Sequence, residues 1–200
     1  MIVKPNAYFD IEVRGATSSG AGQIPALPVV TRLISLLHSI FRDHPGRFAM
    51  ALPGMRTGEN RHPGHVVRVF AENRDDLHEY IQSALQQNER IHGYVLYGRH
   101  SDVPENFEGK WIEYRRYRIP GTRSRLEKCR EYRMNLADNL PYIRLGSKST
   151  GQAFSLYLEA LPGEKTEDCD PDSYGLSIPT RRFCLPDIKL QVQLQHASKN

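Results

Sequence analysis

The stretch from Pro25 to Arg42, PALPVVTRLISLLHSIFR, carries the clearest structural signal in the 200-residue chain. Its apolar side chains recur at the three- and four-residue spacing of one helical face, at Val30, Leu33, Ile34, Leu37 and Phe41. The spacing predicts a helix that buries this face, and Pro45-Gly46 marks its end. The preceding segment, Ala7–Val13, alternates and is rich in Tyr, Phe, Ile and Val, which is typical of a strand.

Three more strands and one more helix complete the first half of the chain. The strands are expected at Arg47–Leu52, His65–Phe70 and His92–Tyr97, and the helix at Asp75–Gln87. The resulting order, β-α-β-β-α-β, is that of a ferredoxin-like domain. A polar loop from Arg99 to Gly109 places a domain boundary there, so we expect an α+β protein whose N-terminal ferredoxin-like domain covers residues 1–98.

A smaller domain with short strands and an arginine-rich helix is expected at residues 99–200. Lys110–Ile119 alternates as an extended segment, and a capping box of Ser124 and Glu127 predicts a helix over Arg125–Leu136. Short strands are predicted at Pro141–Leu145, Ala153–Leu158 and Tyr174–Ser177.

The predicted helix in this second half has a basic edge. At about 100° per residue, Arg130 and Arg133 lie together beside an apolar stripe of Cys129, Tyr132 and Leu136. We expect the stripe to pack on the body of the protein and the arginines to face a partner. An ordinary amphipathic helix with arginines on its wet side is the alternative.

Positive charge is concentrated in one part of the chain. Lys and Arg outnumber Asp and Glu by 27 to 23, which gives a net charge of +4. Residues 110–133 hold nine basic and three acidic side chains, so this segment is +6 and the rest is −2. Such a concentration indicates a polyanionic partner, and seven of the nine are Arg, whose planar donors fit phosphate and guanine. A solvated basic surface is the alternative.

The sequence favours a cytoplasmic protein that needs no membrane and no metal. The longest apolar stretch, 26–41, is interrupted by Pro28, Arg32 and His38, and the N-terminus lacks the apolar core of a signal peptide. The three cysteines, Cys129, Cys169 and Cys184, are widely spaced, as expected for a reducing compartment. His62 and His65 have no further ligands at metal-binding spacing, so no metal site is predicted.

The segment Leu145–Phe154, LGSKSTGQAF, is the most specific local string in the chain. Taken alone, a Gly/Ser/Thr-rich link between two strands is a turn, or a loop whose hydroxyls hold phosphate or ribose. The chain resembles the CRISPR repeat-processing endoribonuclease family of type I-F systems. The resemblance rests on Ser-x-Ser-Thr-Gly-Gln-x-Phe at Ser147–Phe154, Tyr-Gly-Leu-Ser at Tyr174–Ser177, and the Leu37-His38 pair.

The resemblance implies a metal-independent endoribonuclease without cofactors. Such an enzyme binds the stem-loop of CRISPR repeat RNA and cuts at its 3′ base by attack of a ribose 2′-OH, leaving a 2′,3′-cyclic phosphate and a 5′-OH. It then stays on the mature crRNA together with other subunits of a type I-F crRNA-guided surveillance complex. Two alternatives remain open: a non-catalytic RNA-hairpin-binding module, and a ferredoxin-like interaction protein that binds no RNA.

The resemblance also implies site residues. His38 matches the catalytic histidine, Ser147 the serine that orients the 2′-OH, and Tyr174 a tyrosine beside the histidine. The implied RNA-binding residues are Arg115, Arg116, Arg118, Arg123, Arg125, Arg130, Arg133, Ser149, Thr150, Gln152 and Phe154. Arg118 stands where the family has a glutamine. Without the resemblance, His38 is typical of a boundary position on the helix, and both Tyr174 and Phe154 of the hydrophobic core.

Overall fold

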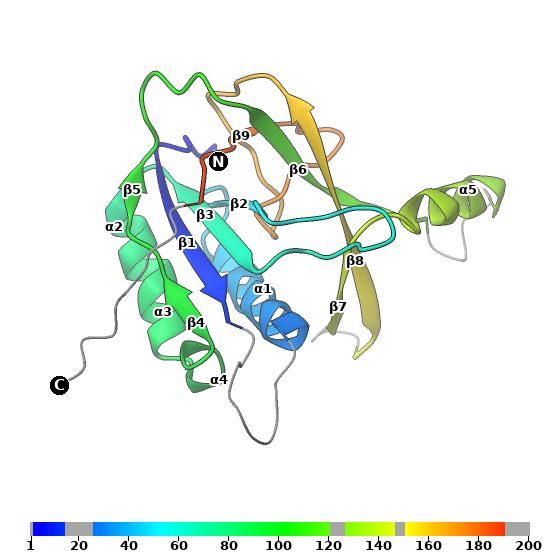
Figure 1. Cartoon of the computed structure of the whole chain (residues 1–200), viewed down its shortest axis with the longest axis horizontal. Helices are drawn as coiled ribbons and strands as arrows, with labels where there is room; N and C mark the ends of the chain where they lie inside the picture. The colour runs from blue at the N-terminus through cyan, green and yellow to red at the C-terminus, as the bar shows by residue number, and fades with distance from the viewer. Residues whose placement is uncertain (1, 15–25, 121–126, 147–150, 191–200) are drawn as a thin grey trace.

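The protein contains two antiparallel sheets with flanking helices (Figure 1). Its structure is a computed structural model that describes residues 2–14, 26–120, 127–146 and 151–190. The mixed α+β class is therefore confirmed. The first sheet has the order β2-β3-β1-β4, and β5 also pairs with β1. Its strands are β1 (Ala7–Val13), β2 (Ala49–Ala51), β3 (Val66–Ala71), β4 (Val95–Tyr97) and β5 (Ser101–Asp102).

Strand β1 has a neighbour on both sides, which explains why nearly every one of its residues is buried. Ile11 stands opposite Val67 of β3 and Tyr97 of β4. The order β-α-β-β-α-β predicted for this half is observed. Strand β5 lies inside the loop predicted at 99–109, because Ser101 and Asp102 pair with the beginning of β1.

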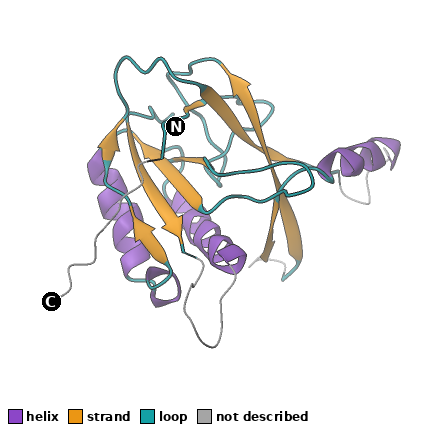
Figure 2. Ribbon diagram, in the orientation of Figure 1, coloured by secondary structure: helices purple, strands orange, loops and turns teal. Residues whose placement is uncertain are grey.

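Helices lie beside this sheet, as Figure 2 shows. Helix α1 (Ala26–Asp43) contacts β1 and the second helical segment. That segment is continuous through α2 (Arg74–Asp76), the π-helix η1 (Leu77–Gln82) and α3 (Ser83–Gln86), and is followed by α4 (Glu89–His92). The Asn73 side chain caps it by accepting from the Asp76 N–H at 2.8 Å. Helix α4 takes up His92, so strand β4 begins three residues later than predicted.

The second sheet has the order β7-β8-β6-β9. Its strands are β6 (Trp111–Tyr117), β7 (Tyr142–Gly146), β8 (Ala153–Gly163) and β9 (Leu185–Pro186). Strand β8 extends five residues beyond its predicted end because it pairs with β6 along its whole far half, up to Gly163 opposite Trp111. Helix α5 (Glu127–Ala137) projects from this sheet (Figure 1).

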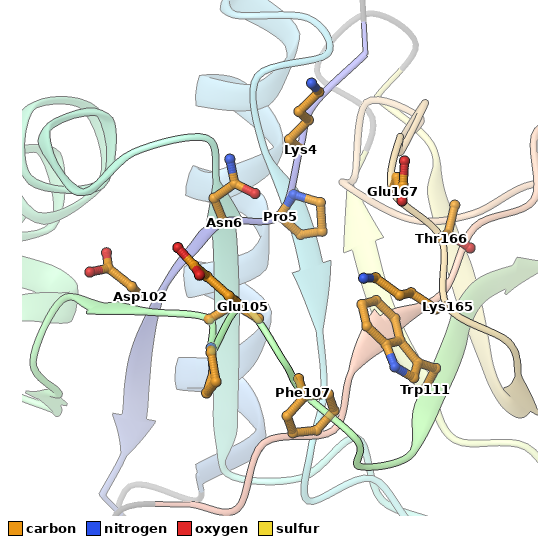
Figure 3. Close-up of a pocket in the computed structure, with 12 residues that line it drawn as sticks. Lys4, Pro5, Asn6, Asp102, Glu105, Phe107, Trp111, Lys165, Thr166 and Glu167 are labelled. Carbon is orange, nitrogen blue, oxygen red and sulfur yellow. The ribbon is translucent and has the colours of Figure 1, made fainter.

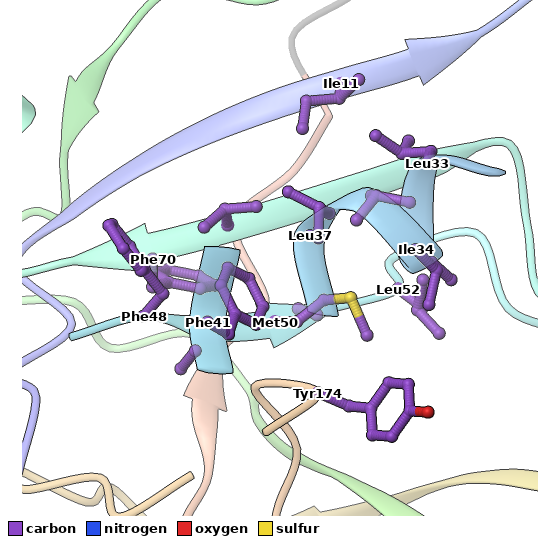
Figure 4. Close-up of a cluster of buried hydrophobic side chains, with 14 of the residues drawn as sticks. Ile11, Leu33, Ile34, Leu37, Phe41, Phe48, Met50, Leu52, Phe70 and Tyr174 are labelled. Carbon is purple, nitrogen blue, oxygen red and sulfur yellow. The ribbon is translucent and has the colours of Figure 1, made fainter. Parts of the chain in front are cut away.

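One hydrophobic cluster joins the two sheets. The predicted face of α1 is buried, with Leu33 and Leu37 fully inaccessible and Phe41 packed against Phe48 (Figure 4). The same cluster includes Leu156 of β8 and other residues of the second half. Each such side chain contributes about 1.5–3 kcal/mol by leaving water, so the sheets stabilise each other.

The strand predicted at Tyr174–Ser177 is wrong. This segment is a turn, in which Gly175 has a φ of 75° and only Ser177 makes a bridge, parallel to Arg115 of β6. A positive φ interrupts the extended backbone of a strand. Glycine adopts such a φ readily because it has no Cβ. The hydrophobic residues of the segment are buried by the turn rather than by strand pairing.

The predicted face of α5 is also wrong. Tyr132 and Leu136 are 65% and 47% exposed, and Cys129 is exposed as well. The helix instead buries Ala137, which packs with Tyr117 and Leu140 in a small cluster. The Arg133 guanidinium lies over the Tyr117 ring at 4.6 Å, so a cation–π contact, and not the apolar stripe, lies between the helix and β6.

None of the helices within the described ranges is both long and apolar enough to cross a bilayer.

Candidate active site

His38 lies on α1, directly after the buried Leu37, and is half-buried. Its Nδ1 is 2.7 Å from the carbonyl oxygen of Ser173. A carbonyl oxygen only accepts, so we assign the proton of the neutral imidazole to Nδ1, which donates this bond. Nε2 is then the nitrogen with an available lone pair, as a general base requires.

The ring of Tyr174 stacks on the imidazole of His38. The two ring centroids are 4.0 Å apart and the ring planes differ by only 7°. Burial raises the pKa of the Tyr174 phenol, an effect that Arg116 opposes and Asp172 reinforces. The phenol is therefore neutral at physiological pH, and its ring lies nearly parallel to the imidazole.

The turn that carries Tyr174 is bound to both sheets. The Gly175 carbonyl accepts from the Met50 N–H of β2 at 2.7 Å, and the Ser177 N–H donates to the Tyr114 carbonyl of β6 at 2.9 Å. Figure 4 shows Tyr174 beside Met50 at the edge of the buried cluster. The Tyr-Gly-Leu-Ser string thus fastens its tyrosine next to α1 on one side and to β6 on the other.

Strand β6 presents arginines to the same place. The Arg116 guanidinium is 5.7 Å from the Tyr174 ring centroid and 5.9 Å from that of Phe154. Arg116 and Arg118, which directly follows the strand, both line a hollow of about 320 Å³ with Phe154 and Tyr157. They also line an adjoining hollow of about 410 Å³ between β6, the end of α1 and the Tyr174 turn.

Two predicted contacts differ in their surroundings from the rest. The Arg115 Nε donates to Glu159 Oε2 at 2.6 Å, so its charge is already balanced on another side of the strand. Phe154 is half-buried and packs against the core, and it also lines the hollow beside Arg116 and Arg118, so it is not fully enclosed in the protein.

The remaining predicted residues fall into two groups. Arg130 and Arg133 of α5 are partly buried, Arg133 reaches Tyr117 of β6, and Gln152 is exposed just before β8. The rest lie outside the described residues: Arg123, Arg125, Ser147, Ser149 and Thr150. The structure thus brings together His38, Tyr174, Arg116, Arg118 and Phe154.

Sequence reasoning missed Asp172 and Ser173. Asp172 Oδ1 accepts from the N–H groups of Tyr174 and Leu176, at 2.8 and 3.1 Å, and Ser173 supplies the carbonyl that binds His38. The available signal was an aspartate three residues before a glycine, which is typical of a turn closed by the aspartate side chain. The sequence analysis instead took the tyrosine and glycine for a strand.

The other clusters of polar residues have a different character. Within the described ranges, no three His, Cys, Asp or Glu side chains lie close enough to hold a metal ion. The His62 and His65 rings are 4.8 Å apart. Burial, followed by the charges of His65 and Arg56, lowers the pKa of His62. A larger hollow of about 580 Å³ is lined by Lys4, Glu105, Phe107, Trp111, Lys165 and Glu167 among others (Figure 3). None of the predicted site residues lines it.

In a comparison with protein families, the chain matches a model described as CRISPR-associated protein (Cas_Csy4) over residues 8–181. The matched range includes α1 with His38, strand β6 and helix α5 with their arginines, and the Tyr174 turn. A comparison with curated proteins gives no match.

Proposed function

Because the chain belongs to the Cas_Csy4 family, the CRISPR repeat-processing endoribonucleases of type I-F systems, we propose that it cuts CRISPR repeat RNA at the 3′ base of its stem-loop. Nε2 of His38 takes the proton of the ribose 2′-OH that precedes the scissile phosphate. The 2′ oxygen attacks phosphorus as the bond to the 5′ oxygen breaks. The products are a 2′,3′-cyclic phosphate and, after protonation of the leaving oxygen, a 5′-OH.

The single observation that carries this proposal is the placement of the imidazole. Its Nδ1 is occupied by the Ser173 carbonyl, its plane is held by Tyr174, and Arg116 lies against the same tyrosine. A base fixed beside a cation suits a reaction in which a proton leaves and negative charge gathers at phosphate. On the motif resemblance, we further propose that Ser147 orients the 2′-OH.

The stem is proposed to end on Phe154, where stacking of a base pair is worth roughly 1–3 kcal/mol. Arg116 and Arg118 then address the bases or phosphates next to the cut, and α5 follows the stem with Arg130 and Arg133. A-form RNA has a major groove too narrow for most side chains, so a basic helix fits a short hairpin better than a long duplex. Further proposed contacts are Arg115, Arg123, Arg125, Ser149, Thr150 and Gln152.

We assign the RNA-binding role to residues 99–200 and a ferredoxin-like domain, which carries His38, to residues 1–98. The antiparallel order β2-β3-β1-β4 supports the second assignment. After cleavage the protein stays on the crRNA and joins other subunits of a type I-F surveillance complex. The free thiols of Cys129, Cys169 and Cys184 support a cytoplasmic location.

The decisive test is His38→Ala. We expect this variant to bind a CRISPR repeat hairpin with wild-type affinity, while its single-turnover cleavage rate falls by roughly 10²- to 10⁴-fold because the base is lost. His92→Ala, a change of another histidine at the end of α4, serves as the control and should cleave normally. Cleavage by His38→Ala at the wild-type rate would show that His38 is not the general base.

The same assay separates the alternatives. Cleavage by the wild type should persist in EDTA and leave a cyclic phosphate; loss of activity in EDTA would indicate a metal-dependent nuclease instead. A non-catalytic hairpin-binding module would give tight, salt-sensitive binding and no product from either protein.

A further inference from the structure

We propose that Asp172 is a positioning residue that sets the orientation of His38 through the turn on which the imidazole rests. This inference rests on the function proposed above. The two groups that hold the imidazole, the Ser173 carbonyl and the Tyr174 ring, come from consecutive residues of one turn. Whatever fixes that turn therefore fixes the base.

The turn is closed by Asp172 with both its side chain and its backbone. Oδ1 accepts from the N–H groups of Tyr174 and Leu176, at 2.8 and 3.1 Å. The backbone N–H of Asp172 donates to the Leu176 carbonyl, and its carbonyl accepts from the Gly175 N–H, both at 2.9 Å. The side chain thus adds two hydrogen bonds to a loop that the backbone alone holds only at its ends.

The other attachments of the turn lie further along the chain. Gly175 is bound to Met50 and Ser177 to Tyr114, which leaves Ser173 and Tyr174 dependent on Asp172. Ser173 is exposed, and it binds His38 through its backbone carbonyl rather than through its side-chain hydroxyl. Loss of the Asp172 carboxylate would therefore release the carbonyl and the aromatic ring together.

Asp172 also lies among cations, which suggests a competing role as their counterion. Arg42, Arg116, Arg118 and Arg181 line the hollow next to it, and two of them have carboxylate partners of their own, Asp43 and Asp170. Burial raises the pKa of Asp172, and the bonds from Tyr174 and Leu176 and the charges of Arg116 and Arg118 act in the opposite direction. Asparagine separates the two roles, because it keeps the acceptor oxygen and removes the charge.

The test compares Asp172→Ala with Asp172→Asn under single-turnover conditions with enzyme in excess. We expect the alanine variant to cleave at least about tenfold more slowly and the asparagine variant to stay within about threefold of the wild type. Both should bind a hairpin with 2′-deoxyribose before the scissile phosphate as tightly as the wild type does. Asp170→Ala, two residues away in a surface ion pair with Arg181, is the matched control and should cleave normally.

A spectroscopic measurement separates positioning from stability. In ¹⁵N NMR spectra of the wild type, the neutral His38 imidazole should carry its proton on Nδ1; Asp172→Asn should preserve this tautomer, and Asp172→Ala should mix it with the Nε2 form. Normal cleavage by Asp172→Ala overturns the proposal. So does an equal loss in both variants, which assigns the role to charge, or a loss with an unchanged tautomer, which assigns it to stability. If the wild type cleaves no hairpin, the proposed function fails, whereas the tautomer still tests the positioning.

Discussion

At the scale of single residues, Gly175 is the most constrained position around the candidate site. Its φ is 75°, and a Cβ there would lie 2.7 Å from Phe41 Cε2 and 3.0 Å from the Met50 backbone nitrogen. The first is a side-chain contact in the core and the second is backbone of β2, so neither yields easily. The glycine is therefore required both for the turn and for its close approach to α1 and β2.

We predict that Gly175→Ala lowers the free energy of unfolding by roughly 2–4 kcal/mol, because it adds a steric clash to the strain of a positive φ. Gly58→Ala is a matched control, since Gly58 has a φ of 84° and nothing within 4 Å of the added Cβ. That variant should lose only about 1 kcal/mol. Urea unfolding measures both, and an equal loss in the two variants would contradict the importance of the clash.

The residue scale also shows what the sequence alone could reach. His38 and Tyr174 were identified by motif resemblance, and the structure places their rings in contact. Ser173 acts through its backbone carbonyl, and a backbone role leaves little trace in residue type. Asp172 acts through its side chain, which accepts from two backbone N–H groups, and its only sequence signal is its place three residues before Gly175.

At the scale of elements, the regularity of the hydrophobic pattern decided whether the buried face of a helix was predicted correctly. Helix α1 was predicted within a residue of its observed ends, because five apolar positions follow one face and all five are buried. Helix α5 buries only Ala137 among its described side chains, and its Arg133 lies over Tyr117. A periodicity argument assumes that the apolar face finds a partner, and α5 projects away from the body (Figure 1).

Strand β6 is tied to the C-terminal part of the chain by a buried carboxylate. Glu113 is 1% exposed; its Oε1 accepts from Ser177 Oγ, and its Oε2 from Arg182 Nη2, each at 2.7 Å. Burial alone would raise the pKa of Glu113, but the bonds from Arg182 and Ser177 outweigh it and the pKa lies below 4.5. The folded protein therefore binds this proton more weakly than the unfolded chain does.

It follows that the stabilisation from ionised Glu113 is complete above pH 4.5 and is lost as the pH falls through the lowered pKa. We predict that Glu113→Gln is less stable than the wild type at pH 7, and that the difference shrinks as the pH is lowered from about 5 to about 3. Urea unfolding at several pH values measures this. A stability difference that stays constant over that range would contradict it.

At the scale of the whole molecule, charge and shape agree. The two sheets share one core, and α5 extends from the second sheet (Figure 1), where Arg133 lies over the Tyr117 ring of β6. An RNA stem lying along α5 and the hollow beside Arg116 and Arg118 would meet cations from both. The described part of the basic segment is thus distributed over α5 and the end of β6, which are in contact through Arg133 and Tyr117.

We therefore predict that Arg130→Gln combined with Arg133→Gln weakens hairpin binding and reduces the slope of log K against log salt by about one to two. Arg74→Gln is the control, because Arg74 pairs with Asp102 beside α2, far from α5 in Figure 1. Binding measured between low and moderate salt distinguishes them. An unchanged slope in the double variant would favour a protein that does not use α5 for RNA.

The bond between His38 and Ser173 joins residues 135 positions apart. A ribosome that has synthesised only the first 170 residues has therefore made the imidazole but not the carbonyl and the ring that hold it. If His38 is the base, a nascent chain that ends before Ser173 is not yet able to cut RNA.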